Sequence, residues 1–109
     1  MAAASISTVI GANGYIVTLS GGGDYAMGYF DYLVEADLSG GSLNISLPDA
    51  RKVGNQIFSV IRSVSALNTL TVNTVLSQTI NGGATAVVAG VLFSVGMFIS
   101  NGTNWRRLV

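Results

Sequence analysis

Short runs in which apolar and polar residues alternate, each closed by a turn sequence, most limit what this chain can fold into. In residues 42–47 (SLNISL), Leu43, Ile45 and Leu47 share one side and polar residues take the other. A period of two residues is that of a β-strand with one buried face. Because turn signals recur about every ten residues, as in small all-β domains, the pattern predicts an all-β protein with short strands.

The same reasoning places the predicted strands along the whole chain. They cover residues 5–10, 15–20, about 29–37, 42–47, 56–64, 68–73, 75–80, 85–89 and 91–99. The glycine-rich residues 21–24 are expected to form a loop. No fixed repeat of 20 to 50 residues is visible. Together the strands predict a single domain built as an antiparallel β-sandwich or jelly roll, with a short barrel as the alternative.

The end of the chain carries the clearest hairpin signal. Asn101 and Gly102 separate an alternating apolar run from a segment that holds Trp105, the only tryptophan. Asn-Gly at this point predicts a tight turn with positive φ at both residues. In the incoming run the odd-numbered residues 93–99 share one face. Trp105 is expected to be the largest packing unit of the closing hairpin.

The scarcity of charge indicates that the protein associates with other chains. Charged residues make up 9% of the sequence, against about 25% in ordinary soluble domains. A surface that repels so little favours assembly with copies of itself or with a larger structure. The net charge is zero, which argues against nucleic acid as a partner. All the acids precede residue 50 and all the bases follow it; pairing between the halves and solvated loop ends both remain open.

Catalytic chemistry has few candidates in this sequence. The chain has no histidine and no cysteine, so the commonest general base, the thiol nucleophile and metal sites built on these residues are absent. The only dense acidic group is Asp31, Glu35 and Asp37. On one strand Asp31 and Glu35 would lie about 13 Å apart, too far for a glycosidase pair. We interpret the group as a solvated strand face and expect no enzyme activity, no cofactor and no metal.

Residues 84–99 (ATAVVAGVLFSVGMFI) are apolar enough to raise the question of a membrane helix. A helix of that length would span about 24 Å, less than the ~30 Å hydrocarbon core of a bilayer. The run is rich in β-branched residues and interrupted by Gly90, Ser94 and Gly96. These features favour two strands and no membrane. A small membrane protein such as a holin is a distant alternative.

Four aromatic residues cluster in the segment 25–37, at Tyr25, Tyr29, Phe30 and Tyr32. The segment fits either a helix or a strand, and Gly28 with the aromatics favours a strand. The four side chains are candidates for a glycan-stacking platform or an interface anchor. Burial in an ordinary core is the more frequent role of such residues.

From about Tyr32 onward the chain resembles small all-β modules of tailed-bacteriophage virions, found in tail fibres and capsid-surface proteins. Residues 34–50 (VEADLSGGSLNISLPDA) are similar to the family's glycine-containing turn, alternating strand and Leu-Pro-Asp-Ala end. The further matching pieces follow in order at residues 57–60, 68–72, 79–83 and 99–105. The last contains Gly-Thr-Asn-Trp and is similar to the module's closing turn and tryptophan.

The resemblance implies a virion structural protein with a β-sandwich-like module that usually assembles as a trimer. It makes residues 31–109 the module and residues 1–30 an N-terminal hairpin or extension, within one domain overall. Its structural anchors would be Leu47, Pro48 and Trp105. The family fixes no binding residues that can be carried over.

Chain length favours one role within that family. A tail fibre needs an attachment domain and a shaft, whereas this sequence holds only the module, as a capsid decoration (cement) protein does. We therefore expect a protein of the capsid surface whose partners are its own copies and the major capsid protein or other virion proteins. The alternative is a tail-fibre or receptor-binding module that recognises a host glycan through Tyr25, Tyr29 and Tyr32.

Overall fold

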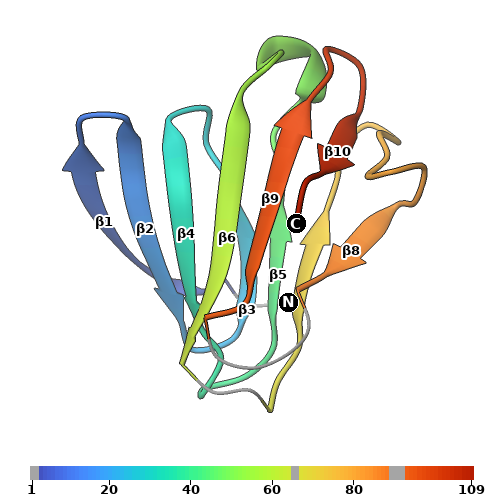
Figure 1. Ribbon diagram of the computed structural model, residues 1–109. Helices are drawn as coiled ribbons and strands as arrows, with labels where there is room; N and C mark the ends of the chain where they lie inside the picture. Colours follow the sequence, from blue (N-terminus) through green and yellow to red (C-terminus); the bar gives the residue numbers. More distant parts are fainter. Residues whose placement is uncertain (1–2, 65–66, 89–92) are drawn as a thin grey trace.

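The computed structural model describes residues 3–64, 67–88 and 93–109. In these ranges the chain forms two β-sheets and one short 3-10 helix, η1 (Ala50–Lys52) (Figure 1). The six-stranded sheet has the order β1 (Ser5–Gly11), β2 (Gly14–Ser20), β4 (Asp31–Asp37), β6 (Ile57–Val64), β9 (Val95–Ser100) and β10 (Trp105–Arg107). The four-stranded sheet has the order β3 (Gly23–Ala26), β5 (Leu43–Ser46), β7 (Leu70–Asn73) and β8 (Thr85–Val87). The all-β prediction is confirmed.

The direction of the strands differs from the prediction. From β2 to β7 the chain alternates between the sheets, so that β2, β4 and β6 run parallel in one sheet and β3, β5 and β7 in the other. Antiparallel neighbours flank these parallel strands: β1 and β9 in the larger sheet and β8 in the smaller. β10 pairs with β9, also antiparallel. The prediction of purely antiparallel sheets is wrong. The turns between β2 and β7 carry the chain across to the other sheet, and crossing turns use the same residues as hairpin turns.

Two of these crossing turns lie directly against each other. A β-carbon added to Gly40 would lie 3.0 Å from Cα of Gly21, and one added to Gly22 would lie 3.3 Å from Cα of Gly41. The backbone of the turn after β2 therefore contacts the backbone of the turn after β4, and a side chain would not fit between them. The predicted loop at 21–24 is only half right, because β3 begins at Gly23.

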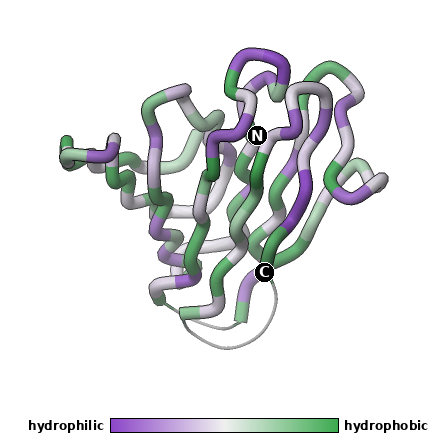
Figure 2. The backbone as a smooth tube through the Cα atoms, turned by 45° about the horizontal axis from the view of Figure 1, so that its top comes forward, coloured by the Kyte–Doolittle hydropathy of each residue, from purple (hydrophilic) through white to green (hydrophobic). Residues whose placement is uncertain are grey.

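The inner faces of the two sheets share one hydrophobic core. The six-stranded sheet contributes Val17, Leu19, Val34, Ala36, Phe58, Val60 and Phe98, and the four-stranded sheet contributes Leu43, Ile45, Leu70 and Val72. The alternation of hydrophobic and hydrophilic residues along the strands is visible in Figure 2. Since Val17 and Leu19 come from β2, residues before 30 pack into the same core as the rest of the chain.

A buried arginine links the two sheets at one side of this core. The side chain of Arg62 points inward from β6 and is 3% exposed. Its guanidinium donates hydrogen bonds to the carbonyl oxygens of Val88 at 2.9 Å and Asn68 at 2.7 Å. Arg62 thus ties β6 to the segments next to β7 and β8 by satisfying backbone acceptors.

The closing hairpin is present, but its turn is longer than predicted. Strands β9 and β10 pair from Ser100 and Trp105, which leaves a loop of residues 101–104. Gly102 has a positive φ of 92°, whereas the φ of Asn101 is not positive. Instead the side-chain oxygen of Asn101 accepts hydrogen bonds from the backbone N–H groups of Thr103 and Asn104, at 3.0 and 2.8 Å. This side-chain turn replaces the predicted two-residue turn.

Another predicted element, the strand at residues 75–80, does not form. Leu76 and Ser77 have positive φ values of 55° and 59°, which no strand residue adopts. The turn is closed by a backbone hydrogen bond from Gln78 to Val75 at 3.0 Å and by the hydroxyl of Thr74, which donates to the carbonyl of Gln78 at 2.6 Å. Of the predicted strands at 85–89 and 91–99, residues 89 and 91–92 lie outside the described residues.

The opening hairpin is confirmed, and its first strand is unusual. β1 pairs with β2 in an antiparallel register from Ser5↔Ser20 to Gly11↔Gly14. It forms the outer edge of the six-stranded sheet (Figure 1), and every one of its residues is exposed.

Candidate functional site

The outward-facing side of the six-stranded sheet carries its apolar side chains mainly on β6, β9 and one row across the sheet, and the neighbouring row contains the polar residues Ser7, Thr18 and Glu35. One row across it runs through Val9, Ile16, Leu33, Ser59 and Met97, which are successive register partners. The apolar outer face, as we call this surface, comprises Val9, Ile16, Leu33, Ile57, Ile61, Val95, Met97 and Ile99. Each of these residues is half-buried or exposed, and Val9 reaches 62% exposure.

The outward-facing side of the four-stranded sheet is mostly polar. Asp24, Asn44 and Thr71 form one row across it, which Val87 ends, and Ser46, Asn73 and Thr85 form the next, which Ala26 begins. We call the six polar residues of these rows the polar outer face. The six-stranded sheet therefore presents more apolar side chains to the surroundings than the four-stranded sheet does, although their inner sides share one core.

Charge on or beside the apolar outer face is sparse. Glu35 lies within it, between Thr18 and Ile61 in the sheet register. Asp37 ends β4 and Arg106 lies on the edge strand β10. Val95, Met97 and Ile99, the odd-numbered residues of β9, belong to this surface. The face that the sequence predicts these residues to share therefore points away from the core. Phe93 lies outside the strand.

Among the four candidate aromatics, Tyr25 is engaged with an acidic side chain. Its hydroxyl donates a hydrogen bond of 2.5 Å to Oδ2 of Asp31, which also accepts one from the N–H of Gly28 at 2.9 Å. Partial burial, together with this hydrogen bond, raises the pKa of the Tyr25 hydroxyl well above its ordinary value. Asp31 is 3% exposed, so the interpretation of this acidic segment as a solvated face is wrong for Asp31.

The other three aromatics occupy different surroundings. Tyr29 is exposed, and its carbonyl accepts a hydrogen bond from the Gln56 side chain at 2.9 Å. Phe30 is exposed and tilts against the ring of Tyr15, with 6.1 Å between centroids. Tyr32 is the extra residue of a bulge, since Tyr15 pairs with Asp31 and Ile16 with Leu33. The ring–ring contacts of the described residues therefore join no two of these four aromatics.

The Leu-Pro-Asp-Ala piece folds into a hydrogen-bonded network that includes the closing hairpin. Leu47, Pro48, Asp49 and Ala50 are all buried. The Ala50 carbonyl accepts a hydrogen bond of 2.5 Å from the hydroxyl of Ser100, and that hydroxyl accepts one of 3.0 Å from the N–H of Gly102. The two sequence pieces that carry the phage resemblance therefore contact each other, although they are about half the chain apart.

Asp49 is the charged centre of this network. Its Oδ1 accepts hydrogen bonds from the backbone and side chain of Arg51, both at 3.0 Å, and from the amide of Gln78 at 2.7 Å. Its Oδ2 accepts one from Arg51 at 2.9 Å, completing an ion pair. These bonds, chiefly those from Arg51, hold the pKa of Asp49 well below its ordinary value. The carboxylate is already saturated with donors.

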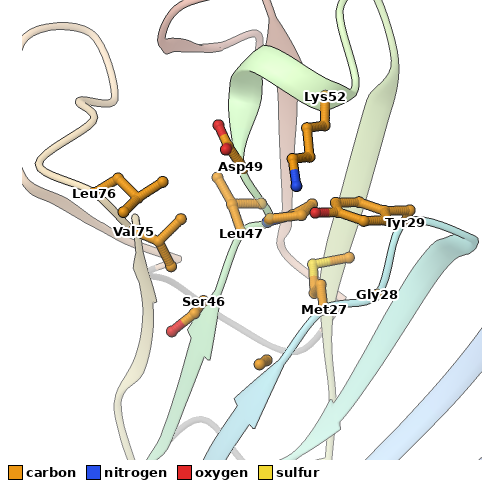
Figure 3. A pocket seen from close by; sticks show the side chains of 11 residues that line it. Met27, Gly28, Tyr29, Ser46, Leu47, Asp49, Lys52, Val75 and Leu76 are labelled. Carbon is orange, nitrogen blue, oxygen red and sulfur yellow. The ribbon is translucent and has the colours of Figure 1, made fainter.

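A pocket of about 380 Å³ opens at the ends of β3, β5 and β7 (Figure 3). Its buried lining includes Met27, Leu47 and Pro48. In Figure 3, Tyr29 and Lys52 lie on one side of the pocket, and Val75 and Leu76 lie on the other. Among the aromatic candidates, only Tyr29 is part of this lining.

Other kinds of site find little support in the described part of the chain. Residues 3–64, 67–88 and 93–109 contain no group of three or more acidic, histidine or cysteine side chains placed to hold a metal ion. The same residues contain no helix long and apolar enough to cross a membrane. No family model matches the chain, and neither does any curated protein or solved structure.

Sequence reasoning missed the pocket and located only part of the apolar outer face. Apolar side chains on both faces of residues 56–64 suit either a central strand or a strand that faces a partner, and the structure places Ile57 and Ile61 on the outer side. The turn at Leu76 was missed because leucine gives no sequence signal for a positive φ. Lys52 was visible as the only lysine, but nothing in the sequence connects it with Met27 or Val75.

Proposed function

We propose that the protein is a non-enzymatic structural protein of a bacteriophage virion, most specifically a capsid decoration protein. In this proposal it assembles as a trimer of β-sandwich-like modules through the apolar outer face and stabilises the head by non-covalent contacts. The phage assignment rests on the sequence resemblance, and the mode of assembly rests on the contrast between the two outer faces. The contrast is the observation that carries the proposal.

Leaving such a surface exposed to water is unfavourable. Soluble monomers rarely expose contiguous apolar patches larger than a few hundred Å². The apolar outer face extends over five of the six strands of its sheet, and each Å² removed from water contributes about 25 cal/mol. A stable interface takes about 800 Å² from each partner. Removing the apolar outer face from water therefore favours association, whereas the polar outer face is suited to remain in water.

The glycan-binding alternative draws less support from the arrangement of the tyrosines. A stacking platform needs aromatic rings presented together to the sugar. Tyr25 is bonded to Asp31, Tyr29 lines the pocket and Tyr32 sits at the bulge. Receptor binding through these three residues stays an untested alternative.

Sedimentation equilibrium of the purified protein tests the mode of assembly. We expect the wild type to form trimers at micromolar concentration and Ile57→Lys, at a position whose register partner is Ile99, to weaken the association by at least about tenfold, because a charge would be buried without a partner. Thr71→Lys, which adds the same charge on the polar outer face, is the matched control and should leave the association unchanged. A wild type that stays monomeric at tens of micromolar would contradict the proposal. Absence of the protein from purified virions would remove the phage assignment separately.

A further inference from the structure

We infer that the pocket at the ends of β3, β5 and β7 binds an extended acidic peptide segment of a partner protein. The segment would insert one large apolar side chain between Met27 and Leu76 and pair its carboxylate with Lys52. This inference does not depend on the proposed function, because the pocket and the apolar outer face belong to different sheets.

The apolar part of the occupant follows from the pocket walls. Met27 and Leu47 form a buried lining and Pro48 lies beside them. The volume of about 380 Å³ falls within the range of pockets that bind organic ligands. Methionine adapts its shape to different apolar partners. The site therefore suits a side chain of the size of phenylalanine or leucine.

Backbone strain supports a binding role for this pocket. Leu76 has a φ of 55° and is 66% exposed, and Ser77 follows with a φ of 59°. The left-handed region is unfavourable for a residue with a bulky side chain, and glycine or asparagine would fit this turn better. The turn instead holds an apolar side chain at the rim of a pocket, in water. Strain of this kind is typical of functional sites.

The positive charge of Lys52 determines which charged group the bound peptide should carry. The hydrogen bonds and ion pair of the described residues engage Asp49 with Arg51 and Gln78, and none of them engages the ammonium of Lys52. The rim of the pocket thus carries one uncompensated positive charge beside a carboxylate that is already satisfied. A carboxylate on the ligand is the complement to this charge.

The open side of the pocket favours a peptide over a small enclosed molecule. Tyr29, Lys52 and Leu76 line the pocket and are themselves exposed. An occupant held between them can continue past the pocket in both directions, as an extended chain does. Aspartate or glutamate next to an apolar residue would supply both required groups.

The probe is the capped hexapeptide Ac-Gly-Gly-Phe-Glu-Gly-Gly-NH2, titrated into uniformly 15N-labelled protein and followed by NMR. We expect saturable shifts of the backbone amides of Gly28, Tyr29, Lys52 and Leu76. The peptide with Gln in place of Glu should bind about two- to fivefold more weakly, the range for an exposed ion pair. The peptide with Ala in place of Phe should show no saturable shift.

Protein variants separate this site from a general attraction for acidic peptides. Lys52→Gln should bind the Glu peptide as weakly as the wild type binds the Gln peptide, while Arg106→Gln, a charge removed elsewhere, should bind like the wild type. Leu76→Asn should bind at least about threefold more weakly without loss of the fold, since asparagine tolerates positive φ. Absence of a saturable shift at about 5 mM peptide, beyond the weakest useful affinity, would overturn the inference. So would equal binding of the Glu peptide to wild type and Lys52→Gln.

Discussion

Trp105 lies edge-on to Phe58, with 5.5 Å between ring centroids and an interplanar angle of 79°, and none of its surface reaches water. It comes from the short edge strand β10, so its ring fixes that strand to the core. An aromatic side chain that is fully enclosed contributes mainly through burial of apolar area.

Trp105→Ala should therefore lower the free energy of unfolding by about 3–5 kcal/mol, the usual cost of removing a buried aromatic side chain. The measurement is denaturant unfolding followed by circular dichroism, at one protein concentration for all variants because assembly adds to apparent stability. Trp105→Phe keeps most of the packing and should cost clearly less. If Trp105→Ala left stability unchanged but abolished assembly, the residue would belong to an interface instead.

Single residues were predictable from sequence only where burial follows from size and spacing. Leu43, Ile45 and Leu47 alternate with polar residues, and all three are buried. Asp31 could not be predicted as buried, because its burial depends on a hydroxyl from Tyr25 and a backbone N–H from Gly28. These partners come together only through the turn between β3 and β4.

The elements show why short strands could be predicted while their pairing could not. Alternation located β2 and β5 because it reflects the two faces of a strand. Pairing direction depends on whether a turn returns along the same sheet or crosses to the other. Val17, Val34 and Val60 are register partners. Because they are unevenly spaced in the sequence, no repeat indicates that their strands pair. β3 was missed since it begins inside a run of glycines.

Gly40→Ala tests the contact between the crossing turns. The new methyl group would stand 3.0 Å from Cα of Gly21, so we expect a loss of about 1–3 kcal/mol in the free energy of unfolding, as for overpacking. Gly83→Ala is the matched control, because its nearest neighbour would lie at an ordinary 3.6 Å. Thermal and denaturant unfolding of the two variants provide the comparison. Equal stability of both would show that the turns separate without cost.

For the molecule as a whole, the proposed mode of assembly rests on the difference between the two outer faces. The low charge content predicts association, and this prediction needs composition alone. Which surface associates could not be predicted, because both faces of a strand such as β6 carry apolar residues and only the arrangement of the sheets shows which one is covered. The structure leaves Ile57 and Ile61 outside and Phe58 and Val60 inside.

Thiol labelling tests most directly whether the apolar outer face is buried in the assembled protein. The chain has no cysteine, so Met97→Cys and Thr71→Cys each place one thiol, on the apolar and the polar outer face respectively. The rate of reaction with a maleimide is measured above and below the concentration of assembly. We predict that the Met97→Cys thiol reacts at least about tenfold more slowly in the assembled protein and that the Thr71→Cys thiol reacts equally fast in both. Equal rates for Met97→Cys at the two concentrations would contradict the central claim.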